Sequence, residues 1–189
     1  MTPAGHIDGL GGILEEIADV FGRAESDLVE RLVDEIAGAR KVLVHGAGRT
    51  GLIMRGLAMR LYHLGLQGHV VGDMTAPPIG PADLLLVNAS TGDLPSGLAH
   101  LQAARRDGAR TVVITAAASG AALEAADRVL RLPAQTMLDD SSGSPRSALP
   151  MGSQYELCLF LLSELAIVQL SKRLGISYLD MRKRHANIL

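Results

Sequence analysis

The stretch Lys41-Val-Leu-Val-His-Gly-Ala-Gly-Arg-Thr-Gly51 is the clearest indication of the fold class. Its β-branched and aliphatic half, up to His45, predicts a short buried strand, and the glycines that follow predict a tight turn. A segment with helical character continues to about Leu64, and Gly65 closes it. Strand, glycine turn and helix in this order form the unit from which parallel α/β sheets are built.

The same unit recurs along the chain. The pattern predicts further strands over 70–71, 84–87, 111–115 and 128–132, a helix over 94–107, and a short alanine-rich helix before the last strand. Continuous apolar strands that alternate with helices indicate a parallel sheet covered on both faces. The sequence therefore predicts an α/β domain.

Helical segments flank this repeat. Apolar residues at helical spacing over 10–37 predict either one bent helix or two, with Ser26 as a candidate cap. A long helix is expected from Pro150 to about Leu174, and Ser177 is expected to cap a final one. Between 157 and 170 the long helix is apolar on nearly every face. Such a helix must be covered on all sides, so we expect it in a subunit interface.

Composition excludes several functional classes. The chain has 189 residues, a length that suits one domain over 1–189. Its net charge is −2 and only 3% of its residues are aromatic, so few side chains could stack on nucleic-acid bases. Only 182–184 forms a basic run, and cations at a helix end usually match the helix dipole. No membrane-length apolar segment and no signal peptide are visible, and Cys158 has no disulfide partner. We expect a cytoplasmic protein without nucleic-acid or membrane partners.

The glycine turn after the first strand is the first candidate site. Ligands of open parallel sheets bind at the carboxyl ends of the strands, where helix N-termini present free N–H groups. Gly48 lets the backbone approach an anion, Arg49 adds a charge and Thr50 adds a hydroxyl. The loop lacks the lysine of a nucleotide-binding P-loop, and Asp73 is a poor candidate for a ribose-binding acid. A tight turn without a ligand also fits the pattern.

The second candidate is Ser90-Thr91-Gly92-Asp93, which follows the strand over 84–87. Its hydroxyl and N–H groups could hold a phosphate, but Asp93 places a negative charge where a phosphate is disfavoured. A plain loop and a ligand contact both remain open at this stage.

Glu156 and His185 are candidate proton-transfer groups. Glu156 lies in the first turns of the long apolar helix, where partial desolvation would favour a base. An acidic residue near a helix start more commonly just matches the helix dipole, which favours the ionised form. His185 lies in a tail with the apolar anchors Ile188 and Leu189, and it could shuttle protons or simply be solvated. His6, His69 and His100 show no pairing that suggests a metal site.

Several collinear segments together resemble the 6-phospho-3-hexuloisomerases, a branch of the SIS (sugar isomerase) family. They are 46–51, 58–65, 70–73, Leu149-Pro-Met-Gly-Ser-Gln-Tyr-Glu156 and Lys183-Arg-His-Ala-Asn-Ile-Leu189. The last two are specific to this branch, whereas the glycine loop is shared widely. The resemblance spans roughly Leu10 to Leu189.

The resemblance implies a SIS-type three-layer sandwich, with a five-stranded parallel sheet flanked by helices. It implies an isomerase that interconverts 3-hexulose 6-phosphate and fructose 6-phosphate through an enediolate, after formaldehyde fixation onto ribulose 5-phosphate. It also implies homo-oligomers, tetramers or dimers, with sites shared between subunits, and no metal or organic cofactor. Glu156 would be the base, His185 of another subunit would move protons at the oxygens, and Arg49 and Thr50 would lie beside the substrate.

The phosphate loop departs from the family pattern. The family sequence Ser-Gly-Ser-Gly-x-Thr corresponds here to Ala89-Ser90-Thr91-Gly92-Asp93-Leu94, and Asp93 stands where the family often has arginine. Hydroxyls are lost at both ends of this loop, and Ser90, Thr91, Gly92 and Ser96 remain as candidate phosphate contacts. Each lost charge-assisted hydrogen bond would weaken phosphate binding by about 1.5–3 kcal/mol. A SIS isomerase for a different sugar and a non-catalytic sugar-phosphate sensor are therefore the alternatives. The segment 139–147 is expected to be a long loop at the pocket mouth.

Overall fold

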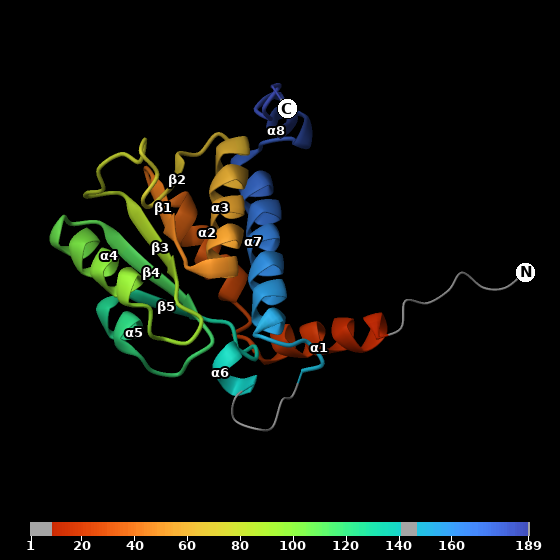
Figure 1. Cartoon of the computed structure of the whole chain (residues 1–189). Coiled ribbons are helices and arrows are strands. Elements are labelled where there is room, and N and C mark those ends of the chain that lie inside the picture. Colours follow the sequence, from red (N-terminus) through yellow and green to blue (C-terminus); the bar gives the residue numbers. More distant parts are fainter. Residues whose placement is uncertain (1–8, 141–146, 189) are drawn as a thin grey trace, which may run out of the picture.

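The centre of the molecule is a five-stranded parallel sheet with the strand order β2-β1-β3-β4-β5 (Figure 1). The structure is a computed structural model that describes residues 9–140 and 147–188. The strands are β1 (Val42–His45), β2 (Gly68–Val70), β3 (Leu84–Asn88), β4 (Arg110–Thr115) and β5 (Arg128–Arg131). All neighbouring strands pair in parallel. The predicted sheet is thus confirmed.

Helices cover both faces of this sheet. Figure 1 shows α4 (Pro95–Arg106) and α5 (Ala121–Ala125) on one face, with α2 (Leu28–Ala37), α3 (Gly48–His63) and α7 (Ser153–Leu174) on the other. The remaining helices are α1 (Leu10–Arg23), α6 (Met137–Asp140) and α8 (Tyr178–Lys183). The three-layer α/β architecture expected from the resemblance is therefore present.

Alternate residues of each buried strand enter two separate cores. Leu84 and Leu86 pack in the core beneath α2, α3 and α7, whereas Leu85 and Val87 pack in the core beneath α4. All five residues of β3 are buried. This two-sided burial is the reason why the strands read as continuous apolar runs rather than as alternating ones.

Most predicted element boundaries agree with the structure, and a few do not. The segment 10–37 forms two helices, and the residue that precedes the second is Asp27 rather than the expected Ser26. Ser177 does cap α8, since its side chain accepts a hydrogen bond from the Asp180 N–H. The short helix α6 was not expected, because four residues carry no periodic signal. The middle of the expected 139–147 loop lies outside the described residues.

Helix α7 leaves an apolar stripe uncovered. It packs against α1, α2 and α3, yet large apolar side chains on it remain 39–51% exposed: Leu157, Phe160, Leu161 and Leu165. Leu52 and Met59 add exposed apolar surface on the neighbouring α3. Within residues 9–140 and 147–188, no helix has the length and hydropathy of a membrane span.

A buried carboxylate fixes the amino edge of the sheet. Asp83 is fully buried and accepts hydrogen bonds from Arg40 Nε at 2.9 Å and Arg40 Nη2 at 3.0 Å. The Gly80 N–H donates to the same carboxylate at 3.0 Å, and Lys41 Nζ lies 3.4 Å away. The hydrogen bonds from Arg40 are the main cause that lowers the pKa of Asp83, and burial opposes them.

We predict that Asp83→Asn destabilises the protein by about 1.5–3 kcal/mol, because it removes charged hydrogen bonds inside the fold. The folded-state pKa of Asp83 is lowered, so its stabilisation is complete above the ordinary carboxyl pKa and is lost as pH falls through the lowered value. Denaturant unfolding of both proteins at several pH values should therefore show a difference that shrinks in acid. Asp107→Asn, at the exposed Arg106–Asp107 pair, is the control and should change stability by under about 0.5 kcal/mol. A difference that does not vary with pH would contradict this account.

Candidate functional site

The site is located where the strand order reverses direction. From β1 the chain runs outward to β2 on one side, and β3 lies on the other side of β1. Loops that leave β1 and β3 therefore diverge to opposite faces and open a crevice at the carboxyl edge, where ligands of open α/β sheets bind. The two loops singled out in the sequence, 46–51 and 90–93, are these two loops.

A cavity of about 390 Å³ lies in this crevice. Its volume falls within the usual range for sites that bind small molecules. Its walls include six of the residues predicted from the sequence: Gly48, Arg49, Thr50, Ser90, Thr91 and Glu156. The structure thus brings together the starts of α3 and α7 and the loop after β3. Gly92, Ser96 and His185 do not line it.

An arginine–glutamate pair stands in the wall of this cavity. Arg49 Nε donates to Glu156 Oε1 at 3.0 Å, and Arg49 Nη2 lies 2.6 Å from Glu156 Oε2. Nη2 also donates to the Met151 carbonyl oxygen at 3.2 Å and to Ser153 Oγ at 3.1 Å. The Glu156 side chain is only 19% exposed, whereas that of Arg49 is 56% exposed. The carboxylate is therefore fixed in place by a guanidinium that remains open to the cavity.

Close backbone contacts explain the glycines of the first loop. A Cβ on Gly51 would stand 2.6 Å from the Gly46 carbonyl oxygen, so no side chain fits there. Gly48, the first residue of α3, has a φ of 55°, which favours glycine. Thr50 Oγ1 donates to the Ala47 carbonyl oxygen at 2.8 Å and stabilises the same turn. Gly48, Arg49 and Thr50 line the cavity, and the N–H groups at the start of a helix have no partner within that helix.

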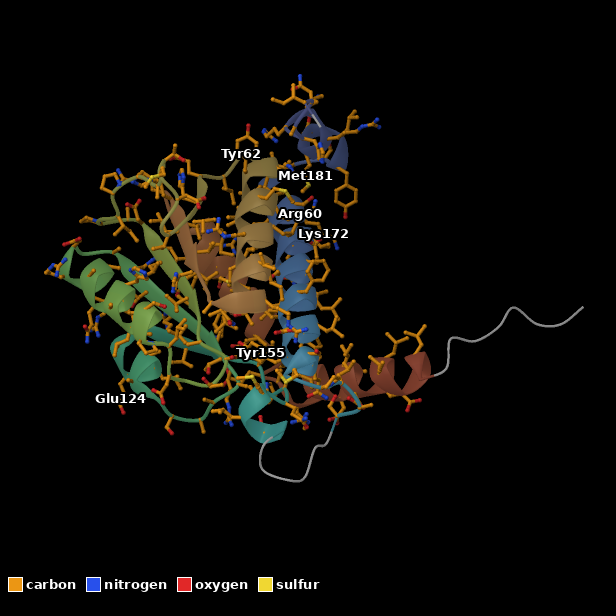
Figure 2. The ribbon with its side chains drawn as sticks, in the orientation of Figure 1. Arg60, Tyr62, Glu124, Tyr155, Lys172 and Met181 are labelled. Carbon is orange, nitrogen blue, oxygen red and sulfur yellow. The ribbon has the colours of Figure 1, made fainter. Side chains whose placement is uncertain are left out.

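The start of α7 is held against the sheet by a buried hydrogen bond. Asn88 Nδ2, at the end of β3, donates to the Tyr155 hydroxyl at 2.7 Å, and both residues are 1% exposed. Burial raises the pKa of the Tyr155 hydroxyl, so this group stays neutral. Figure 2 shows Tyr155 at the lower end of α7. Because Glu156 is the next residue, this bond also sets the distance between the acid and the loop after β3.

Just before α7, Met151 has a φ of 58°, a left-handed conformation that is uncommon outside glycine. Its carbonyl oxygen is the one that accepts the hydrogen bond from Arg49. Strained backbone of this kind concentrates at functional sites. This strain could not be predicted from the residue types, because Gly152 favours a positive φ and Met151 does not.

The loop after β3 differs from the expectation at Asp93. Asp93 Oδ1 accepts a hydrogen bond from the Ala121 N–H at 3.0 Å, so the carboxylate is bound at the start of α5. It is absent from the walls of the cavity. The negative charge that we expected to disfavour a phosphate is therefore bound at the start of α5 and does not line this cavity. Gly92 is required by the close approach of the backbone, because a Cβ there would stand 2.4 Å from the Ser119 carbonyl oxygen.

Ser96, which was expected to contact the substrate, contacts His45 instead. Its Oγ lies 3.0 Å from His45 Nε2, and the rings of His45 and His100 meet edge to face with centroids 4.6 Å apart. Burial, followed by the neighbouring His100, lowers the pKa of His45. In this structure Ser96 therefore anchors α4 to the end of β1.

His185 lies at the opposite end of the molecule from Glu156. Its ring stacks on that of His63, near the end of α3, with centroids 5.4 Å apart. Figure 2 shows Met181 of α8 beyond the upper end of α7 and Tyr155 at the lower end. A helix rises about 1.5 Å per residue, so the 22 residues of α7 span roughly 33 Å. Within one chain, His185 and Glu156 cannot act on the same substrate.

A residue that sequence reasoning missed, Glu16 on α1, holds the segment before α7. Its carboxylate accepts hydrogen bonds from Ser147 Oγ, from the Ala148 N–H at 3.0 Å and from Gln154 Nε2 at 3.2 Å. The Ala148 N–H is the main cause that lowers the pKa of Glu16, and burial opposes it. Gln154 Oε1 in turn accepts from the Gln135 N–H at 2.7 Å. No local pattern predicts these partners, which come from distant parts of the chain.

No group of three or more histidine, cysteine, aspartate or glutamate side chains in the described part of the chain is arranged to hold a metal ion. Cys158 is buried, and burial raises its pKa to about 11. The polar groups that line the cavity include the carboxylate, the guanidinium and the hydroxyls described above.

Comparison with known proteins finds clear relatives. The chain is 33% identical to the 3-hexulose-6-phosphate isomerase of Mycobacterium gastri, over the full length of both chains. It is 29% identical to the 3-hexulose-6-phosphate isomerase of Bacillus subtilis, over 93% of this chain and 95% of the relative. A crystal structure from Methanococcus jannaschii, from which a 3-hexulose-6-phosphate isomerase function was inferred, superposes with a TM-score of 0.80 at 28% identity and covers 94% of this chain and 97% of that one. A scan against models of protein families finds no match.

We predict that Glu16→Ala loosens the segment that leads into α7. The amides of Ala148 and Tyr155 should exchange with deuterium about tenfold faster or more, because the charged hydrogen bonds that close this segment are lost. Glu15→Ala, at the exposed neighbouring position on α1, is the matched control and should leave these rates unchanged. Equal exchange in both variants would show that Glu16 does not hold the segment.

Proposed function

Because the chain belongs to the 3-hexulose-6-phosphate isomerase family, we propose that it interconverts 3-hexulose 6-phosphate and fructose 6-phosphate. The observation that carries the proposal is the Arg49–Glu156 pair in the wall of a cavity at the switch point of the sheet. A fixed carboxylate beside a guanidinium and a set of N–H groups and hydroxyls suits proton transfer on an anionic sugar.

In the proposed reaction, Glu156 is the base. In 3-hexulose 6-phosphate the carbonyl is at C3, and the proton to be removed is on C2. Taking this proton gives a 2,3-enediolate, and its return to C3, with a proton shift between the oxygens, gives the 2-ketose. No atom is gained or lost, so the reaction requires one well-placed acid–base group and stabilisation of the enediolate charge.

Arg49 would stabilise that charge. Without substrate, both oxygens of Glu156 are in contact with this guanidinium. A bound sugar must therefore displace part of this contact, which frees a carboxylate oxygen for C2. The guanidinium remains anchored by the Met151 carbonyl and by Ser153 Oγ, and it can face the enediolate oxygens. Gly48, Thr50, Ser90 and Thr91 would contact the rest of the substrate.

We also propose that the site is completed by a second copy of the chain. His185 is on the far end of α7 from Glu156, so only a neighbouring subunit could bring it to this cavity. The exposed apolar stripe of α7, with the apolar surface of α3 beside it, is suited to such an interface. A homotetramer or dimer would then place His185 of one copy near the substrate oxygens of another. We further propose a place in the cytoplasm, after formaldehyde fixation onto ribulose 5-phosphate.

A different sugar phosphate is the second candidate substrate. Ala89 and Leu94 lack the hydroxyls that the family places there, and Ala89 is buried at 2% exposure. The loop therefore offers fewer donors to a phosphate than the family pattern does. A protein that binds sugar phosphates without turnover is the third outcome, and conversion of 3-hexulose 6-phosphate in the assay below would exclude it.

We predict that the purified protein converts 3-hexulose 6-phosphate, generated in situ from ribulose 5-phosphate and formaldehyde, to fructose 6-phosphate. Glu156→Gln should lower kcat by about 100- to 10,000-fold, the usual contribution of a general base. The matched control is Glu164→Gln, which breaks a similar pair between α3 and α7 with Arg60 at 3.0 Å and should retain turnover. A Glu156→Gln enzyme with wild-type kcat would overturn the assignment of the base.

We predict that inactive variants restore each other in mixed oligomers. Glu156→Gln and His185→Ala should each be impaired alone, because each lacks one half of every site. Co-expressed with different affinity tags and purified through both, they should regain turnover, since some sites then combine intact residues from two copies. Mixed oligomers that remain as inactive as their parents would contradict shared sites.

A further inference from the structure

A second cavity, of about 590 Å³, adjoins the proposed active site. The two cavities share three lining residues, Ser90, Thr91 and Thr136. The second cavity extends from there across the carboxyl ends of β4 and β5 towards α1. A ligand that occupies the first cavity and passes the Ser90–Thr91 loop therefore enters the second.

The acidic residues around this second cavity already have partners. Glu16 accepts the three hydrogen bonds described above. Asp19 pairs with Arg23 at 2.9 Å, and Asp139 Oδ2 accepts hydrogen bonds from the backbone N–H and the hydroxyl of Thr136. The charges of Glu16 and Asp139 are thus committed to backbone and side-chain donors, and that of Asp19 to an arginine on its own helix.

Arg131 differs from these residues. Its guanidinium has no carboxylate within ion-pair distance among the described residues, and its Nε donates a hydrogen bond to the Ala116 carbonyl oxygen at 3.3 Å. Within residues 9–140 and 147–188, neither terminal nitrogen of this guanidinium has a hydrogen-bond partner, so both can bind a ligand. An arginine in this state offers a fork of donors that matches a phosphate.

The backbone connects Arg131 to the loop after β3. Arg131 is the last residue of β5, and Ala116 follows β4. The Ala116 N–H donates to the Ser90 carbonyl oxygen at 3.0 Å. The Ala116 carbonyl, which holds the guanidinium, therefore lies next to the Ser90–Thr91 loop at the carboxyl edge of the sheet. The side chains of Arg131, Ser90 and Thr91 all line the second cavity.

We propose that Arg131 binds the phosphate group of the substrate, together with Ser90 and Thr91. This proposal rests on the proposed function, in which C2 and C3 lie at Glu156 and the phosphate lies three carbons beyond C3. It explains how a loop with Asp93 in place of a cation serves a phosphosugar, because the cation comes from β5 instead. Asp93 does not interfere, since its carboxylate is bound to the Ala121 N–H.

The test compares Arg131→Met with Arg128→Met. Arg128 lies on the same strand, and its Nε is paired with Glu35 at 2.7 Å. Arg128→Met therefore shows the effect of removing an arginine from β5 that is not expected to contact the substrate. Arg131→Met should raise KM for 3-hexulose 6-phosphate by roughly 10- to 100-fold, the effect of one charged hydrogen bond or bidentate contact, and should change kcat only a few-fold. Arg131→Lys should recover part of the affinity. Arg128→Met should leave both constants at the wild-type values.

Calorimetric titration with inorganic phosphate and with fructose 6-phosphate tests the subsite without turnover. The wild type and Arg128→Met should bind both, Arg131→Met should bind both more weakly, and unphosphorylated fructose should show no difference between variants. If the wild type proves inactive but this binding pattern holds, the phosphate subsite stands and the proposed reaction fails. Wild-type phosphate binding by folded Arg131→Met would overturn the subsite, whatever the activity.

Discussion

The pairing of Arg49 with Glu156 is the interaction on which the account of the site depends. It joins residues 107 positions apart in the sequence, and it links the first turn of α3 to the first turn of α7. A partly exposed ion pair of this kind contributes little to the stability of a fold. Its consequence is geometric, because it fixes a carboxylate and a guanidinium side by side at the carboxyl edge of the sheet. Small displacements of either helix would change their alignment with a substrate.

Other contacts in the fold fix the positions of the N-termini of α3 and α7 relative to each other. The buried Asn88–Tyr155 bond holds α7 against β3, and the Glu16 carboxylate holds the segment before α7 from the other side. The close approach of Gly46 and Gly51 fixes the start of α3. Uncommon backbone at Met151 is tolerated because these contacts surround it. The site is thus built on the ends of rigid elements, the arrangement that gives the most reproducible geometry.

Sequence reasoning predicted the sheet, the order of its elements and the extent of α7, because strong apolar periodicity and glycine punctuation mark them. It also found six of the residues that line the cavity, since loops after β1 and β3 must meet at one edge. It could not predict the role of Asp93, whose partner Ala121 is distant in the chain, or the contacts of Glu16 and Arg131. Such contacts depend on tertiary packing and leave no local pattern. The same limit applies to Ser96, which looked like a phosphate contact and instead meets His45.

The most direct test of the central claim is proton exchange on fructose 6-phosphate in D₂O, followed by NMR. A base that forms a 2,3-enediolate removes the proton on C3 of the 2-ketose, so the wild-type protein should introduce deuterium at C3. We expect deuterium at C3 and none at C1. Exchange at C1 would indicate a 1,2-enediolate and hence an aldose–ketose isomerase. Absence of exchange at C3 would contradict the claim that Glu156 and Arg49 catalyse this isomerisation.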